Sequence, residues 1–301
     1  MCIRDSLIDL GAKVTVLDNL STGSVKNIER LIGTKGFKFL KGDVSELEIG
    51  EYDCIIHAAA LPSPDIYVKR PVETMVSNSL GTFRVLEASR RHDGLVLYTS
   101  TSEVYGDAEL IPTPETYWGR VNPIGVRACY DESKRFSEAL CMAYHRQYGI
   151  DVRVARIFNT YGPRLDPNAK YARVISRFII QALKNEPITI HGDGKQTRSF
   201  CYISDTVNAL LRMLSIDGLG GEVINVGSQH EVSIIELAKL IRRLVGSNSK
   251  FEFQPPRPDD PRRRCPDISK AKRLLGWEPK VGLEEGLTRT IEWFRHELQN
   301  R

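Results

Sequence analysis

Short apolar runs alternate with longer amphipathic stretches along the first half of the chain. The short runs predict β-strands over residues 13–17, 37–41, 54–57, 95–99 and 152–156. Two of the longer stretches, residues 71–91 and 130–148, have the apolar spacing of helices. Strands that alternate with helices are typical of a parallel sheet with helices on its faces. The pattern therefore predicts an α/β fold with a Rossmann-like, doubly wound parallel sheet.

The second half is less regular, because proline and glycine interrupt the pattern after Asn159. A basic, proline-rich loop is expected over residues 257–266. A closing helix has apolar residues at core spacing, namely Leu283, Leu287, Ile291, Phe294 and Leu298. We interpret the chain as two domains, a larger Rossmann-like domain and a smaller C-terminal domain. The larger covers residues 1–161 with a return segment at 199–225, and the smaller covers 162–198 and 226–301.

The start of the chain departs from this plan. A doubly wound nucleotide-binding fold begins with a strand, a glycine-rich turn and a helix. Here Leu7–Gly11 resembles the end of that first helix, and residues 14–18 resemble the second strand. We therefore expect the first strand and its G-x-x-G-x-x-G turn to be missing from this sequence, with Met1–Ser6 as foreign residues from an incomplete gene model.

Composition excludes several classes of protein. The chain has 301 residues, of which 41% are hydrophobic and 27% charged, as in ordinary globular proteins. Lys plus Arg exceeds Asp plus Glu by 42 − 38 = +4, which is too little to indicate nucleic acid but suits an anionic small substrate. No apolar run approaches the roughly 18 residues of a membrane span, and no signal peptide is visible.

The cysteines and histidines indicate neither disulfides nor a metal. The six cysteines form no C-x-x-C motif, and the six histidines have no metal-ligand spacing. We interpret the cysteines as reduced thiols, which predicts a cytoplasmic protein.

Tyr130 and Lys134 are the strongest catalytic candidates. They are four positions apart, so they share one face of a predicted helix. An ammonium beside a phenol stabilises the phenolate and lowers the phenol pKa from about 10, which produces a general base near neutral pH. Thr101, Ser102 and Glu103 follow a predicted strand, where hydroxyl groups can hold a substrate alcohol. On this motif alone, an ordinary surface Tyr/Lys pair remains an alternative.

A dinucleotide site is expected at the ends of the second, third and fourth strands of the doubly wound order. Asp18 ends a predicted strand, where a carboxylate can accept both hydroxyls of an adenosine ribose and would repel a 2′-phosphate, which favours NAD over NADP. Asp43 could reach the adenine, and the small residues of 57–61 allow close backbone approach. The cofactor candidates are Asp18, Asn19, Gly23, Asp43, Val44, Ala59, Leu61, Tyr130 and Lys134. A polar turn and plain helix–strand packing are the alternatives.

Six segments carry a resemblance to a known family: Thr99–Gly106, Tyr117–Lys134, Val152–Pro163, Gly192–Tyr202, Asp259–Ile268 and Leu275–Pro279. Through them the chain, from about Leu7 onward, resembles the extended short-chain dehydrogenase/reductase superfamily of nucleotide-sugar epimerases, dehydratases and decarboxylases. Dehydratases of this superfamily carry Asp-Glu at the position where this chain has Ser102-Glu103. In this respect the chain is similar to the glucuronate decarboxylases of the superfamily, which carry Ser-Glu there. His57–Pro64 and Ser133 differ from the usual pattern, which leaves another uronate substrate open.

The resemblance implies NAD-dependent decarboxylation of UDP-glucuronate to UDP-xylose through a 4-keto intermediate. It implies that Tyr130 is the base, that Lys134 holds the phenolate and the nicotinamide ribose, and that Thr101 binds the reacting oxygen. Ser102 and Glu103 would orient the sugar ring. Four residues are implied to bind substrate: Asn159, Arg173, Arg198 as a diphosphate clamp, and Arg264, also counted as catalytic because it would face the uronate.

The resemblance also implies a homodimer, in which two helices from each copy form a four-helix interface. Leu80, Phe83 and Glu87 on one helix and Phe136, Leu140 and Tyr144 on the other have suitable spacing. Two other functions remain open. One is a UDP-sugar 4-epimerase, and the other is a catalytically impaired homologue that binds nucleotide sugars.

Overall fold

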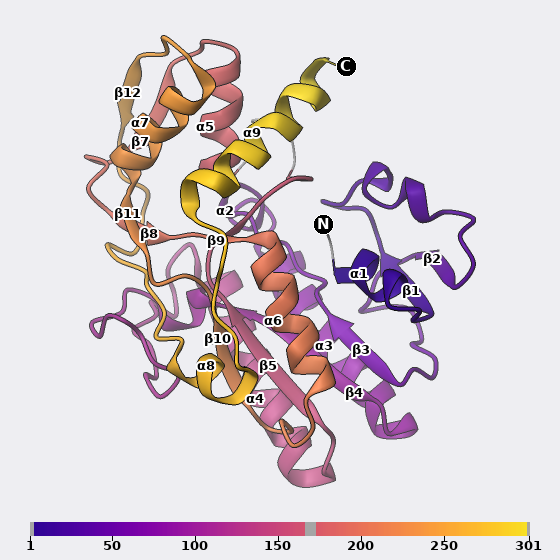
Figure 1. The fold of residues 1–301 in the computed structure, drawn as a ribbon. Coiled ribbons are helices and arrows are strands. Elements are labelled where there is room, and N and C mark those ends of the chain that lie inside the picture. The colour runs from indigo at the N-terminus through magenta and orange to yellow at the C-terminus, as the bar shows by residue number, and fades with distance from the viewer. Residues whose placement is uncertain (1–2, 166–172, 300–301) are drawn as a thin grey trace.

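A four-stranded parallel sheet forms the centre of the computed structural model, which describes residues 3–165 and 173–299 (Figure 1). Its order is β10–β5–β4–β3, and every neighbouring pair is parallel. The strands are β3 (Cys54–His57), β4 (Leu95–Thr101), β5 (Val152–Ile157) and β10 (Val223–Val226). This sheet confirms the predicted α/β fold, and β3 has the bounds expected from the sequence.

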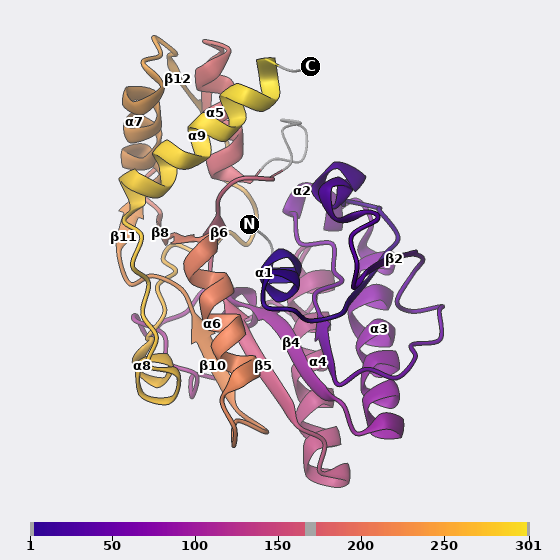
Figure 2. The ribbon, with the colours of Figure 1, turned by 45° about the vertical axis from the view of Figure 1, so that its right-hand side comes forward.

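Helices cover both faces of this sheet (Figure 2). Helices α3 (Pro71–His92) and α4 (Ala128–Tyr148) pack on one face, where Val96 and Tyr98 of β4 join their core. On the other face Leu97 joins a core that includes α6 (Ile203–Ser215) and α8 (Ser269–Leu275). Neighbouring residues of one strand thus serve opposite cores, as the alternation of a strand requires.

A second, smaller sheet lies apart from the first. It consists of β1 (Val14–Asp18) and β2 (Phe37–Lys41), paired in parallel. The short α1 (Ile3–Asp9) lies between β1 and α6, and the 3₁₀ turns η1 (Val25–Asn27) and η2 (Glu29–Leu31) follow β1. In the described part of the chain no strand joins β1 to β3, so all five residues of β1 are only half-buried.

A second lobe holds most of the remaining chain around its own apolar core. That core contains Phe178, Leu237 and the three buried residues Leu287, Ile291 and Phe294 of the predicted closing helix. The elements of this lobe and its connections are α5 (Val174–Leu183), α7 (Ile234–Val245), α9 (Leu283–Gln299), β7 (Ile188–His191) with β12 (Phe251–Gln254), β8 (Thr197–Ser199) with β11 (Glu231–Ser233), and β6 (Thr160–Tyr161) with β9 (Cys201–Tyr202).

The predicted division into two domains remains a proposal, and the packing refines it. Helix α8 belongs by sequence to the proposed substrate domain of residues 226–301, yet Ala271 and Leu275 pack on the central sheet beside α6. The described cysteines, Cys54, Cys129, Cys141, Cys201 and Cys265, are all free thiols. Within residues 3–165 and 173–299 no helix is both long and apolar enough to cross a membrane.

Candidate active site

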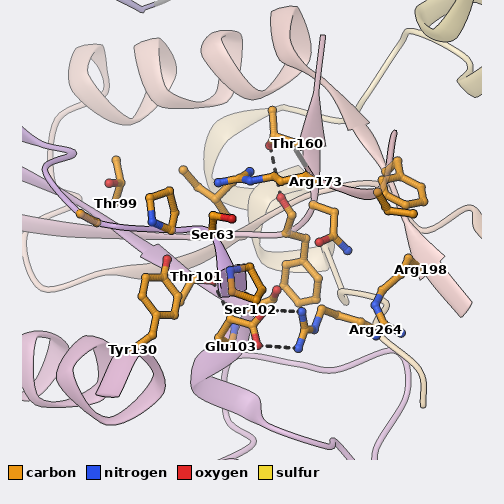
Figure 3. Close-up of a pocket in the computed structure, with 18 of the residues that line it drawn as sticks. Ser63, Thr99, Thr101, Ser102, Glu103, Tyr130, Thr160, Arg173, Arg198 and Arg264 are labelled. Atoms are coloured by element: carbon orange, nitrogen blue, oxygen red, sulfur yellow. Dashed lines mark hydrogen bonds and ion pairs between the residues drawn. The ribbon is translucent and has the colours of Figure 1, made fainter. Parts of the chain in front are cut away.

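A cavity of about 460 Å³ lies between the carboxyl ends of β3, β4 and β5 and the smaller lobe. Ligands of open α/β sheets bind at these strand ends. Nine residues predicted to be catalytic or to bind substrate line it: Thr101, Ser102, Glu103, Tyr130, Lys134, Asn159, Arg173, Arg198 and Arg264. Figure 3 shows most of them around one space. The fold thus brings together residues from widely separated parts of the chain.

The end of β4 presents the first of these groups. Thr101 closes the strand, and its hydroxyl accepts the backbone N–H of Glu103 at 3.2 Å. A short 3₁₀ turn, η3 (Ser102–Tyr105), follows and ends at Gly106, whose φ is +60°. A side chain at Gly106 would clash with the carbonyl oxygen of Arg120. The tight turn holds Ser102 and Glu103 against the cavity.

Tyr130 lies in the first turn of α4, and burial raises its pKa to about 12, an effect that Arg173 and Thr101 offset only in part. Its ring stacks on Tyr67 of the short helix α2 (Pro64–Tyr67), with 5.0 Å between ring centroids and 5° between planes. The Nζ of Lys134 donates to the carbonyl of Thr99 at 2.9 Å and lies 4.7 Å from the ring centroid of Tyr98. Burial lowers the pKa of Lys134 to about 8.

The expectation that Lys134 lowers the pKa of Tyr130 is therefore wrong for the chain by itself. Helical spacing places the two residues on one face, but the ammonium is directed to a backbone carbonyl. Desolvation of the phenol then dominates, because removing a phenolate from water favours its protonated form.

Glu103 is held by two arginines. Arg264 forms a bidentate pair with it, at 2.5 Å to Oε1 and 2.8 Å to Oε2, and Figure 3 shows both contacts. Arg127 adds a contact of 2.5 Å to Oε2. Burial alone would raise the pKa of Glu103, but Arg264 and Arg127 outweigh it and hold the pKa below its usual range. The carboxylate is therefore ionised beside Tyr130.

Further polar and basic groups line the same cavity. Arg198 donates to the carbonyl of Thr197 at 2.7 Å and pairs with Asp260 at 2.9 Å. The Nδ2 of Asn159 is buried without a partner among the described residues. Arg173 is exposed at the start of α5. These groups can bind an anionic ligand such as a diphosphate.

Sequence reasoning missed several charged lining residues, among them Arg127, Arg177, Arg257 and Asp260. Arg177 follows Arg173, the N-cap residue of α5, by four positions, so i, i+4 spacing was a usable signal. Burial lowers the pKa of Arg177 to about 10, and its Nε has no partner within the described chain. Arg257 pairs with Asp65 of α2 at 3.2 Å, a contact that no sequence spacing indicates.

The predicted adenosine-binding residues gather at the ends of β1 and β2, outside this cavity. Asp18 accepts the N–H of Leu20 at 2.7 Å, and a Cβ at Gly23 would lie 2.9 Å from its Oδ2. Asn19 donates to Asp43 at 2.7 Å. A carboxylate beside a glycine at a strand end fits the ribose of a dinucleotide, so these residues suit NAD.

Three other cofactor candidates, Val44, Ala59 and Leu61, are not in the lining of the cavity. Val44 packs near Gly81 of α3, where a Cβ would lie 2.7 Å from its side chain. After β3, the cavity is lined by Ala58 and Ala60, whereas Ala59 and Leu61 are not in its lining. Their predicted contact with NAD stays a prediction.

A parallel sheet with helices on both faces and a buried Tyr/Lys pair at the carboxyl ends of its strands is typical of a short-chain dehydrogenase/reductase-type enzyme. The arginines that line the cavity indicate that its substrate is an anion. Residues 2–290 match the family model described as GDP-mannose 4,6 dehydratase. The chain belongs to this family of NAD-dependent epimerases and dehydratases.

Curated relatives narrow the similarity. The chain is 48% identical over 299 residues to UDP-glucuronic acid decarboxylase 1 of Xenopus tropicalis, covering 99% of this chain and 70% of that protein. It is 49% identical over 286 residues to UDP-glucuronic acid decarboxylase 3 of Arabidopsis thaliana, covering 95% of this chain and 82% of that protein.

Solved structures share the fold over nearly the whole chain. The UDP-glucose 4-epimerase of Thermotoga maritima with UDP-glucose has a TM-score of 0.90 at 34% identity, covering 98% of this chain and 95% of that one. The UDP-glucuronic acid 4-epimerase of Bacillus cereus, in complex with UDP-glucuronic acid and NAD, has a TM-score of 0.87 at 27% identity, with the same coverage.

Proposed function

We propose that this chain decarboxylates UDP-glucuronate to UDP-xylose through a 4-keto intermediate, with NAD as cofactor. The observation that carries the proposal is the bidentate contact of Arg264 with a carboxylate, Glu103, in the cavity that also contains Tyr130. A guanidinium that already binds a carboxylate near a base suits a sugar whose acid group lies close to the reacting carbon. The names of the curated relatives support the same reaction.

The residues of the chain divide the work. Tyr130 takes the proton of the 4-hydroxyl, and Thr101 holds the reacting oxygen. When bound, NAD supplies a hydride acceptor and donor at C4 and a positive charge that favours the phenolate of Tyr130. A ketone at C4 is β to the carboxylate, so carbon dioxide can leave with its electrons delocalised into an enolate. Ser102 and Glu103 orient the ring and manage protons near C5.

The test is a product analysis with UDP-glucuronate labelled in its carboxyl carbon and excess NAD. The proposal expects labelled carbon dioxide and UDP-xylose without net NADH. Equimolar NADH with a stable 4-keto product would indicate an oxidative decarboxylase instead.

A 4-epimerase is the second candidate, because solved UDP-sugar 4-epimerases have TM-scores up to 0.90 with this chain. UDP-galacturonate as sole product, with all carbons retained, would establish it. A catalytically impaired binding homologue is the third. The convergence of Thr101, Glu103, Tyr130 and Lys134 on one cavity argues against it.

We also propose a homodimer through α3 and α4 and a cytoplasmic location. Leu80 and Phe83 are 40% exposed and Phe136 52%, although they are apolar. Glu87 and Tyr144, expected at the same interface, bond to each other within one copy at 2.6 Å. Sedimentation should give a dimer at micromolar concentration and a monomer for Phe83→Glu. The free thiols suit a reducing compartment.

A further inference from the structure

Arg127 lies where three parts of the molecule meet. Its carbonyl accepts the backbone N–H groups of Tyr130 and Asp131 at the start of α4. Its guanidinium donates to Glu103 at 2.5 Å and to Asp260, in the loop between β12 and α8, at 3.2 Å. Only 8% of its side chain is exposed. One buried arginine therefore links the helix of the base, the end of β4 and the loop that carries Arg264.

Arg264 has two roles that compete. In the structure it forms a bidentate contact with Glu103. Under the proposed function it must bind the uronate carboxylate. A planar guanidinium presents limited donor edges, so the substrate carboxylate must take over some or all of the contacts that Glu103 now occupies.

Glu103 would lose its stronger partner at that moment unless another cation remained. A buried carboxylate without a partner tends to take up a proton. Arg127 contacts Oε2 of Glu103 through its Nη2 from a separate element, the start of α4, so Arg264 is not needed for this contact.

We propose that Arg127 is a positioning residue that keeps Glu103 ionised and directed into the cavity while Arg264 transfers its contact from Glu103 to the carboxylate of the substrate. The inference rests on the proposed function. It assigns to Arg127 the role of keeping Glu103 ionised during turnover. It also explains why Glu103 has two arginine partners where one would satisfy it.

The charged and titratable groups around Glu103 come from several elements. They are Arg264, Arg127 and Arg198, which favour its ionised form, and Tyr67, Tyr130 and Asp131, which interact with its charge. Burial and the charge of Glu103 raise the pKa of Asp131 above its usual range. With Arg264 occupied by substrate, Arg127 is the nearest remaining cation in this group with a direct contact to Glu103.

The experiment compares Arg127→Gln, Arg127→Lys and a matched control, Arg135→Gln. Arg135 also lies on α4 and donates to the carbonyl of Val104 at 2.9 Å, so its loss removes a tether from the same turn without touching Glu103. For each protein, kcat and KM for consumption of UDP-glucuronate are measured from acidic to alkaline pH with NAD in excess. Thermal unfolding checks that each variant is folded.

Arg127→Gln should lower kcat by about tenfold to about 100-fold, the scale of a misplaced catalytic group. The acidic limb of its profile of kcat against pH should move to higher pH by at least about one unit, because Glu103 becomes easier to protonate. KM should change less than kcat. Arg127→Lys should keep the wild-type limb, and Arg135→Gln should keep both the limb and the rate.

An unchanged acidic limb in Arg127→Gln, whatever its kcat, would overturn the proposal, because a purely structural role would lower the rate without moving the limb. If that variant does not fold, Arg127→Lys decides, since a shifted limb in a variant that keeps the positive charge would also overturn it. The products of the wild-type protein test the proposed function separately. Those products are either carbon dioxide with UDP-xylose or a 4-epimer. The pH profile is measured from substrate consumption, so it can be read whichever product forms.

Discussion

The two ends of the candidate site are built differently. At the substrate end, Glu103 and Arg264 are 161 positions apart in the sequence, and their side chains are 15% and 6% exposed. At the dinucleotide end, Asp18 bonds a backbone N–H only two positions away, and its strand is half-buried throughout. A buried long-range pair holds the substrate end, whereas the contacts of Asp18 and Asn19 at the dinucleotide end are a local turn and an exposed hydrogen bond.

This difference has consequences for stability and motion. Breaking a buried pair leaves an uncompensated charge, which is costly. A turn of the kind around Asp18 contributes little to global stability and opens more readily. We therefore expect substitutions at the substrate end to affect unfolding, and those at the dinucleotide end to affect mainly ligand binding.

The largest effect is expected for Arg264→Met. It leaves Glu103 buried with one partner fewer and should lower the free energy of unfolding by about 4 kcal/mol. Its neighbour Arg263 is the control, because it forms an ion pair with Glu231 while 55% exposed, and Arg263→Met should cost less than about 1 kcal/mol. Urea unfolding measures both. Equal losses in the two variants would remove the contrast between buried and exposed pairs.

Lys134 is buried in the wall of the cavity and should make stability depend on pH. Its pKa falls from 10.5 to about 8 on burial, so the unfolded state binds more protons between these values and the free energy of unfolding rises with pH there. Lys134→Met removes this dependence. The variant should therefore gain stability over wild type by up to about 3 kcal/mol at neutral pH, and the gain should shrink above pH about 8.

Urea unfolding at several pH values checks this, with the exposed Lys195→Met as control. A difference between Lys134→Met and wild type that stays constant across pH would mean that Lys134 keeps its ordinary pKa.

Tyr130→Phe should leave the fold intact and lower turnover by at least about 10²-fold, the lower scale for a positioned acid–base group. That corresponds to about 2.7 kcal/mol in the barrier. Turnover of UDP-glucuronate and thermal unfolding are measured together. Tyr148→Phe, on the same helix and 48% exposed, is the control. Turnover near the wild-type rate in Tyr130→Phe would exclude this phenol as the base.

The smallest effect on stability is expected for Asp18→Asn. The amide can still accept the N–H of Leu20, so unfolding should change by less than about 1 kcal/mol. Affinity for NAD should fall, because an uncharged amide is a weaker acceptor for ribose hydroxyls. Calorimetric titration with NAD tests this, with Asp217→Asn as an exposed control. A large loss of stability with unchanged NAD binding would show that Asp18 stabilises the fold and does not bind the dinucleotide.

Much of the fold and of the site membership followed from the sequence. The runs 37–41 and 54–57 coincide with β2 and β3, because runs of four or five residues have the length of a strand and are too short for an ordinary helix. Tyr130, Lys134 and Glu103 were recognisable because their chemistry depends on local motifs that share one helix face or one strand end. All three line the same cavity.

Tertiary structure alone decided how these residues are paired and ionised. The contact of Arg127 and Arg264 with Glu103 depends on the meeting of β4, α4 and a loop far along the chain, and no spacing encodes it. The pKa of Tyr130 moved opposite to the expectation, because it depends on burial and on the direction of the Lys134 side chain. Sequence determined which groups are present, since helix and strand periodicity is local. Their protonation and partners required the fold, because desolvation and Coulomb interactions depend on distances through space.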